Sequence, residues 1–357
     1  MFNKIEDQPD YIFRKLHPAQ PSEAAPPLLH YSDRADEIYS EHVKEPKSFE
    51  LGMAFAKDLI ISGRSVARDR RAPLLLGPLM PEYVDSFASK NLIGQEHGIK
   101  GKNPRYVPGL SALVSHFNIG VYGHWLMESV PKLLLLAMHA GELPPFRIIL
   151  HESAPQFASE WIRLILPDAH IELYDSSTEY VLCEQVVIPS CLAIKGYFFH
   201  PITNDLIDRL VKMHFVKSDP RFLYLTRESQ SGYREMSNRQ EIENAACASG
   251  LELVSPEVLS IPDQINLFAN AKLIVSEFGS ISHNSIFSPP HTHVFCLNWI
   301  NMVQSRIAQL RRQTVGYQLP RSGLAVKYEP DITEKRFYQI DKERFKMNLD
   351  CLLESAG

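Results

Sequence analysis

Short apolar runs alternate with helically spaced apolar residues along most of the chain, and this alternation predicts its secondary structure. Runs rich in Val, Ile, Leu and Phe predict strands at residues 146–151, 170–175, 184–190, 221–227, 251–257 and 293–299, and residues 272–280 are predicted as a strand followed by a loop. Apolar residues three and four apart predict helices at residues 124–139, 154–166, 204–215, 238–250, 260–271 and 282–287. Strands that alternate with helices form largely parallel sheets covered by helices. The predicted fold class is therefore α/β.

This alternation occurs twice, with a break near Asp219-Pro220, and predicts two doubly wound, Rossmann-like domains. Residues 16–30 are rich in proline and alanine, which predicts an irregular start to the chain. The predicted boundaries are 1–70 for an irregular N-terminal arm, 71–218 and 219–325 for the two α/β domains, and 326–357 for a tail that a helix could occupy.

The helix predicted at residues 124–139 carries a polar ridge on an apolar body. His124, Glu128 and Lys132 follow one another at steps of four, so they share one helix face. Pro131 is expected to bend or break this helix. Two interpretations of the ridge stay open: a solvated face, or a face turned to a substrate with His124 as a general base and Glu128 beside it. Lys132 is interpreted as structural in either case.

Two predicted strands of the second domain end in residues suited to an anion. Thr226 and Arg227 follow one strand, and Glu277, Gly279 and Ser280 end or follow another. Ligands of open parallel sheets bind beyond the carboxyl ends of the strands, so these ends predict a diphosphate site. The alternatives are a turn glycine and a surface arginine paired with a carboxylate.

Composition narrows the classes of function. A formal net charge of −5 gives no general case for nucleic acid as a partner. The five cysteines never form a CxxC spacing, and His291 and His293 lack nearby carboxylates or cysteines, so no metal site is predicted. No secretory signal and no apolar run of about 20 residues is found. We therefore expect a cytoplasmic protein. The basic run at residues 306–312 leaves peripheral contact with anionic lipid, and so with the inner membrane, as an open alternative to a solvated surface.

Residues 222–290 resemble the core of glycosyltransferase family 61, with order and spacing kept over about seventy residues. The matching positions are Thr226, Arg227, Arg234, Asn238, Glu241, Pro256, Leu259, Ser260, Gln264, Phe268, Ala271, Gly279, Asn284, Phe287, Pro289 and Pro290. The His124-aromatic segment, with its downstream acid and proline, also fits the family, and the resemblance covers roughly residues 115 to 300. Where many members carry histidine before the loop glycine, this chain has Phe278, and His283 could supply an imidazole from the other side of the loop.

The resemblance implies a GT-B arrangement, in which two Rossmann-like domains face a cleft and the second binds the nucleotide sugar. It implies inverting sugar transfer without a metal or other cofactor, by a hexosyl- or pentosyltransferase. The expected donor is a nucleotide sugar, in particular a UDP-sugar, and the expected acceptor is a saccharide of bacterial capsule or other surface polysaccharide. The residues implied are His124 and Glu128 for catalysis, and Arg227, Arg234, Glu277, Gly279, Ser280, His283 and Asn284 for donor binding. The alternative is a non-catalytic protein that binds nucleotide sugar or polysaccharide on the same fold.

Overall fold

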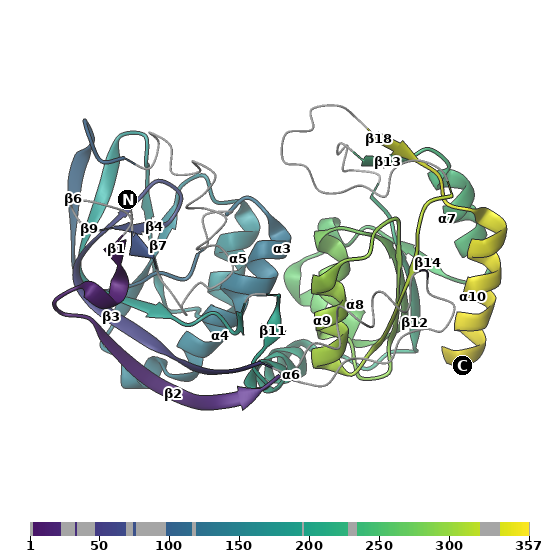
Figure 1. Cartoon of the computed structure of the whole chain (residues 1–357), viewed down its shortest axis with the longest axis horizontal. Helices are drawn as coiled ribbons and strands as arrows, with labels where there is room; N and C mark the ends of the chain where they lie inside the picture. The colour runs from purple at the N-terminus through teal and green to yellow at the C-terminus, as the bar shows by residue number, and fades with distance from the viewer. Residues whose placement is uncertain are drawn as a thin grey trace. The chain divides into compact units, whose positions relative to one another are not determined.

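The chain forms two units, each built from a β-sheet and helices (Figure 1). Unit 1 comprises Met1–Ser22 and Lys47–Leu206, and unit 2 comprises Glu23–Pro46 and Ile207–Gly357. The computed structural model describes residues 3–22, 33, 47–68, 74–75, 98–115, 119–194, 196–227, 234–321 and 336–356. The predicted α/β class is confirmed in its general form, since helices accompany parallel strands in both units.

Unit 1 contains a seven-stranded mixed sheet. Its strands, in spatial order, are β2 (Ile12–Pro21), β3 (Ser48–Ser62), β9 (Glu179–Pro189), β6 (Asn103–Ala112), β7 (Phe146–His151) and β8 (His170–Tyr174), and β4 (Val66–Arg68) pairs with β3. From β9 to β8 the strands are parallel, as the sequence predicts. From β2 to β9 they are antiparallel. The sheet is therefore parallel only in the half that alternates with helices.

The prediction of an irregular arm over residues 1–70 was wrong for two segments, because β2 and β3 lie in this sheet. The fifteen residues of β3 include Leu51, Met53, Leu59 and Ile61, which are buried in the core of unit 1. The division between units also differs from the predicted boundaries. It falls between Leu206 and Ile207, inside helix α6 (Ile202–His214).

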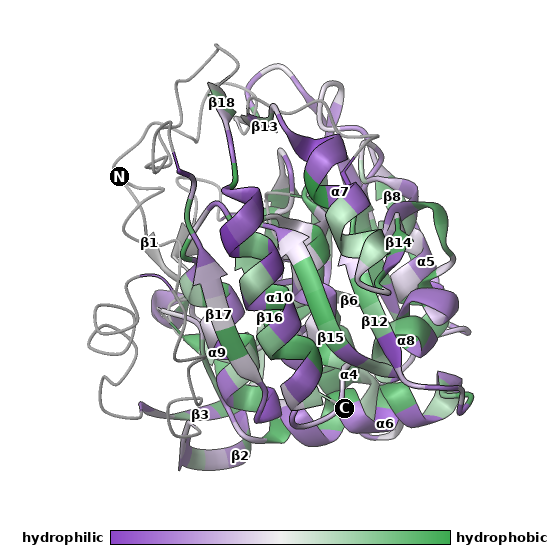
Figure 2. Ribbon diagram, turned by 90° about the vertical axis from the view of Figure 1, so that its right-hand side faces the viewer, coloured by the Kyte–Doolittle hydropathy of each residue, from purple (hydrophilic) through white to green (hydrophobic). Residues whose placement is uncertain are grey.

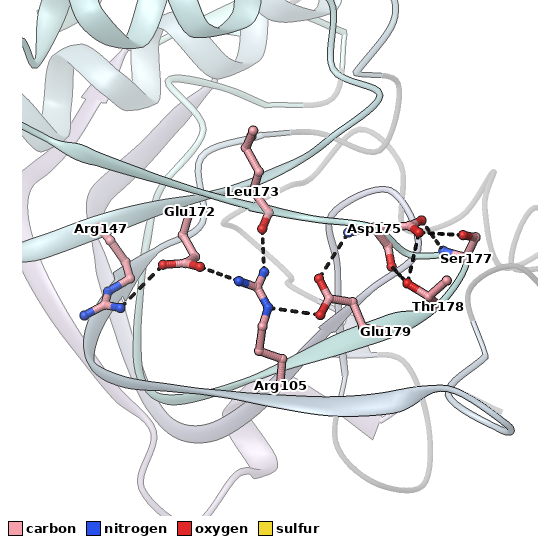
Figure 3. Close-up of polar contacts among 8 residues, drawn as sticks. All are labelled: Arg105, Arg147, Glu172, Leu173, Asp175, Ser177, Thr178 and Glu179. Atoms are coloured by element: carbon pink, nitrogen blue, oxygen red, sulfur yellow. Dashed lines mark hydrogen bonds and ion pairs between the residues drawn. The ribbon is translucent and has the colours of Figure 1, made fainter.

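The parallel edge of this sheet is held by an ion-pair network centred on Arg105 of β6 (Figure 3). The guanidinium contacts Glu172 and the carbonyl oxygen of Leu173, and its Nε lies 3.1 Å from a carboxylate oxygen of Glu179. These partners lie on β8 and β9, so one side chain of β6 contacts the adjacent strand β9 and also β8, which follows β7 in the sheet order. All the groups are engaged with one another, and we interpret the network as structural.

Unit 2 contains a five-stranded, all-parallel sheet. Its spatial order is β14 (Glu252–Val254), β12 (Arg221–Leu225), β15 (Ala271–Glu277), β16 (His293–Leu297) and β17 (Thr314–Gln318). Helices α7 (Arg239–Ala248) and α10 (Lys342–Ala356) cover one face, and α8 (Ile261–Ala269) and α9 (Met302–Arg311) cover the other (Figure 1). The body of β15 is apolar (Figure 2), as expected for a strand buried on both faces. When these five strands are numbered along the chain, their spatial order is 2-1-3-4-5, which is a doubly wound topology.

The remaining elements are short or connect the two sheets to their helices. The short strands are β1 (Asn3–Lys4), β5 (Leu74–Leu75), β10 (Ala193–Ile194), β11 (Phe198–Phe199), β13 (Arg234–Met236) and β18 (Arg336–Tyr338). The other helical segments are η1 (Ile5–Asp7), α3 (Tyr122–His124), η4 (Trp125–Ser129), α4 (Val130–Met138), η5 (Ala140–Glu142), α5 (Gln156–Ile165), η6 (Pro256–Val258) and η7 (Ser280–Phe287). No helix within the described ranges is long and apolar enough to cross a bilayer.

Candidate functional site

The topology of unit 2 brings two predicted site segments together. The chain leaves β12 for β14 on one side and later returns to β15 on the other side, so the strand order reverses between β12 and β15. Leu225, at the end of β12, pairs with Ser276, next to the end of β15. Such a switch point opens a crevice beyond the carboxyl ends of the strands, where ligands of these folds bind. Arg227 and Gly279 both lie just past this edge.

The Arg227 guanidinium lies beside the loop that contains Gly279. Nη1 of Arg227 donates a hydrogen bond of 2.9 Å to the carbonyl oxygen of Phe278. The backbone of Gly279 is extended, with φ of 169°, so its conformation does not require glycine. A Cβ at this position would lie 3.3 Å from Nη1 of Arg227, which is tight for such a contact. The glycine therefore leaves room for the guanidinium beside the loop.

Glu277 lies below this edge in a buried polar network. Its side chain is 2% exposed; one carboxylate oxygen accepts from Nε of Arg239 at 3.0 Å, and the other accepts from the hydroxyl of Tyr338. Burial, and then the charge of Glu277, raise the pKa of Tyr338. Glu277 is the last residue of β15, and its two contacts hold α7 and β18 against the sheet.

Arg239 is a cationic residue at this edge that the sequence reasoning did not single out. It is the first residue of α7, its side chain is 19% exposed, and Glu277 fixes its position. Its place one residue after Asn238, at the start of a helix that follows β12 and β13, was an available signal. Asn238 does not cap this helix with its side chain but donates to the carbonyl oxygen of Ile340 at 2.8 Å.

The other predicted donor-site residues lie in three places. Asn284 and His283 are buried in η7: Asn284 donates to Gln264 at 3.2 Å, and Nδ1 of His283 lies 3.4 Å from Oε1 of Gln304. Ser280 is half-buried at the start of η7, so it lies at the same edge as Gly279. The backbone of Arg234 pairs with β18, and its side chain lies outside what the structure describes.

In unit 1, the predicted helix at residues 124–139 forms as one helical stretch with an irregular turn. A π-helical turn, η4, spans Trp125–Ser129 and passes directly into α4, whose second residue is Pro131. Proline has no N–H to donate into the preceding turn, so the predicted disturbance at Pro131 takes the form of this wider turn. π-Turns of this kind occur frequently at functional sites.

The ridge on this helix is buried for most of its length, so the solvated-face interpretation is wrong for Glu128 and Lys132, which are 4% and 1% exposed. Nδ1 of His124 lies 2.8 Å from Oε1 of Glu128, and the hydroxyl of Tyr197 donates to the same oxygen at 3.2 Å. An ionised carboxylate can only accept, so the Nδ1 proton points to Glu128 and Nε2 is the nitrogen that can take up another proton. The His124 side chain is 24% exposed.

Lys132 continues the ridge into the core. Its Nζ is buried and has no hydrogen-bond partner among the described residues. Burial lowers the pKa of Lys132, opposed by Cys191 and Glu128. Trp125 is also in the core, where it donates to the carbonyl oxygen of Ile119 at 2.8 Å.

The structure changes the interpretation of the basic run and places His293 at the start of a strand. Arg306 and Arg311 of the basic run are 2% and 4% exposed, so they cannot form a lipid-facing patch. His293 begins β16. Within the part of the chain that the structure describes, no group of three or more His, Cys, Asp or Glu side chains is placed to hold a metal ion.

Comparison with known proteins finds a family match that includes residues of both sites. Residues 122–295 match the family model of Glycosyltransferase 61. The matched range begins at the helix that carries His124 and Glu128, and it includes β12, β15 and η7 of unit 2. No curated protein matches the chain. The match supports glycosyltransferase family 61, and this family implies an enzyme with a sugar donor and an acceptor.

Proposed function

We propose, proceeding from this family match, that the chain is an inverting, metal-independent glycosyltransferase that moves a sugar from a nucleotide sugar to a saccharide. The observation that carries the proposal is the His124–Glu128 pair, because a base oriented by a carboxylate is what a transferase needs and a simple binding protein does not. In this pair Nδ1 carries the proton, so Nε2 is the basic nitrogen of the ring.

On the donor side, the support comes from Arg227. One of its guanidinium N–H groups is fixed on the carbonyl of Phe278, which orients the planar group at the switch point. Guanidinium groups bind phosphate oxygens through paired, charge-assisted hydrogen bonds. We assign the diphosphate to Arg227 and the backbone from Gly279 to Ser280, with Arg239 as a second cation at the same edge. Glu277, His283 and Asn284 then support the loop from below.

In the proposed reaction, Nε2 of His124 accepts the proton of the acceptor hydroxyl. The hydroxyl oxygen forms the new bond to the anomeric carbon, and the bond from that carbon to the diphosphate oxygen breaks with its electron pair. Attack from the opposite side inverts the anomeric configuration. Glu128 stabilises the imidazolium that results, and Arg227 stabilises the charge on the leaving diphosphate.

The finer expectations from the sequence are part of this proposal. They are a UDP-sugar as donor, transfer of a hexose or pentose, an acceptor in bacterial capsule or other surface polysaccharide, a cytoplasmic location, and the GT-B fold class. The family match supports the general activity, glycosyl transfer with a sugar donor and an acceptor.

Donor binding and transfer are tested separately on the same protein. Thermal unfolding with UDP and other nucleoside diphosphates, in the presence of a chelator, should show stabilisation by at least one of them. Arg227→Ala should weaken that binding about tenfold or more, because a charge-assisted bond contributes about 1.5–3 kcal/mol. Arg221→Ala is the matched control, since this arginine on the same strand pairs with Glu252 at the strand's other end.

Transfer is then measured with the sugar nucleotide of the diphosphate that binds, with product configuration determined by NMR. His124→Ala should leave donor binding unchanged and lower turnover by roughly 10²–10⁴, the usual contribution of a general base. His139→Ala is the control, because Nδ1 of His139 lies 2.9 Å from Glu142 in a similar pair on the same helical stretch. Donor binding without any transfer, or full turnover by His124→Ala, would favour the binding-protein alternative or another base. Binding that appears only with added divalent metal would contradict the metal-free mechanism.

A further inference from the structure

The segment at the end of α6 presents apolar side chains to solvent. Met213, Phe215 and Val216 are 64%, 45% and 67% exposed, although they follow one another within four residues. The core-facing apolar residues of the same helix are Leu206, Ile207 and Leu210, which are buried. The packing of α6 therefore does not account for the exposed group. Exposed apolar side chains that gather in one place, rather than singly, indicate an interaction surface.

The backbone of this segment is fixed by α8. Oδ1 of Asn266 accepts from the N–H of Val216 at 2.7 Å, and Nδ2 of Asn270 donates to the carbonyl oxygen of Val216 at 3.0 Å. Oδ1 of Asn270 accepts from the N–H of Ser218 at 3.0 Å. The side chains of Asn266 and Asn270 thus hydrogen-bond backbone groups of the segment, and these bonds fix its backbone conformation.

The charged side chains of the segment itself are basic. Residues 209–217 include Arg209, Lys212 and Lys217, all exposed, and no carboxylate. The nearest carboxylate before the segment, Asp208, lies 2.7 Å from Nη2 of Arg311, and Asp219 follows the segment. Basic side chains next to exposed apolar side chains are complementary to an anionic lipid bilayer, which has negatively charged headgroups above a hydrocarbon interior.

We propose that residues 212–217 dock the protein on the surface of an anionic lipid bilayer. Met213, Phe215 and Val216 enter the boundary between headgroups and acyl chains, and Lys212 and Lys217 contact the lipid phosphates. This combination of apolar insertion and electrostatic attraction is how peripheral segments bind anionic membranes. The inference does not depend on the proposed transfer activity, because none of these residues belongs to the donor or acceptor site.

The test is cosedimentation of the full chain with vesicles of phosphatidylcholine alone or mixed with phosphatidylglycerol. The parent should bind only the mixed vesicles, and added salt should release it. The double variant Lys212→Glu/Lys217→Glu should have a partition coefficient onto the mixed vesicles that is lower by about tenfold or more. The reason is that each basic residue contributes on the order of 1 kcal/mol near such a surface. Phe215→Ser/Val216→Ser should also lower partitioning. Nucleoside diphosphate binding should be unchanged in both variants.

A matched control lies on α10, where Lys346 is exposed beside Met347, which is 60% exposed. Lys346→Glu/Met347→Ser should bind vesicles like the parent. Thermal unfolding of all variants checks that the fold is kept, which is expected because the altered side chains are exposed. Absence of parent binding to the mixed vesicles, or equal binding by the parent and both segment variants, would overturn the proposal. Sedimentation equilibrium provides a second check: self-association of the parent that Phe215→Ser/Val216→Ser abolishes would assign the surface to a second copy of the chain instead.

Discussion

Lys132 carries an energetic cost that the rest of its helix does not. A buried donor without a hydrogen-bond partner costs about 1–3 kcal/mol, and the Nζ of Lys132 is in this position among the described residues. The burial of the apolar side chains of α4 contributes stabilising free energy that offsets this cost. Proximity to Glu128 and Cys191 recovers only part of this cost, since burial still lowers the pKa of Lys132.

Lys132→Met should therefore raise the free energy of unfolding, by about 1–3 kcal/mol at neutral pH. Because the folded-state pKa is lowered, the unfolded chain holds the proton more tightly, and the parent gains stability as pH rises from that folded pKa toward the usual lysine range. The methionine variant should lack this rise. Urea unfolding over a pH series measures both effects. A variant that is less stable than the parent at every pH would show that the ammonium has a partner worth more than its burial costs.

At this scale the sequence identifies part of the candidate site. Arg227 and Gly279 could be paired in advance, because the carboxyl ends of neighbouring parallel strands meet at one edge. The role of Glu277 could not, since its partners Arg239 and Tyr338 come from α7 and β18, and their approach depends on tertiary packing. Helical spacing predicted one face for His124, Glu128 and Lys132, but spacing alone does not show whether that face is buried.

At the scale of elements, β2 is attached to the start of α6 through a neutral histidine. The Pro18 carbonyl can only accept, so Nε2 of His200 carries the proton and donates to it at 3.1 Å, while Nδ1 accepts from the N–H of Ile202 at 3.3 Å. Protonation of Nδ1 would break the second bond. Burial lowers the pKa of His200; the Pro18 carbonyl opposes this shift, and His17 adds to it.

Unit 1 should consequently lose stability in acid. The folded-state pKa of His200 is lowered, so its contribution is present above the ordinary histidine pKa and falls as pH drops below it, with the unfolded chain taking up the proton first. Between about pH 7 and about pH 5 the parent should lose on the order of 1 kcal/mol through this residue. His200→Gln, which keeps a donor for Pro18 but does not titrate, should show a smaller loss. Equal acid sensitivity in both proteins would place the titrating group elsewhere.

Element boundaries show where sequence patterns succeed. Strand β7 and helices α5 and α6 could be predicted because the apolar residues of each element follow a single spacing, either a continuous run or helical spacing, and the segments are well delimited. β2 and β3 were missed, since proline in β2 and the mixed alternation of β3 resemble irregular chain. β2 pairs with β3, and β3 pairs with β9, in both cases antiparallel. The partners β3 and β9 are far apart in sequence, so local periodicity does not reveal their pairing.

At the scale of the whole molecule, one residue of the N-terminal part belongs to the other unit. Asp33 donates through its N–H to the carbonyl oxygen of Tyr317 at 2.8 Å, and its carboxylate accepts from the N–H of Leu319 at 2.7 Å and contacts Arg344. The two sheets could be predicted from the repeated alternation of strands and helices. The assignment of Asp33 to unit 2 could not be predicted, because a local sequence pattern does not specify which unit a residue joins.

Asp33→Ala should destabilise unit 2 by about 1–3 kcal/mol, since it removes a charge-assisted contact and leaves the Leu319 N–H without its acceptor. Hydrogen exchange should accelerate in β17 and α10 more than in the sheet of unit 1. Arg321→Ala is the control, because its exposed ion pair with Asp341 spans 3.8 Å and should contribute less than about 1 kcal/mol. Uniform acceleration across both units would contradict a local role.

The place of Asp33 also sets an order of events while the protein is made. Its partners Leu319 and Arg344 follow it by 286 and 311 residues. At roughly 5–20 residues added per second, the ribosome needs roughly 15–60 s to produce them after Asp33 has been synthesised. Throughout that interval the Asp33 carboxylate lacks its native partners Leu319 and Arg344, while the strands of unit 1 are synthesised and can pair. Unit 2 can close around Asp33 only when translation is nearly finished.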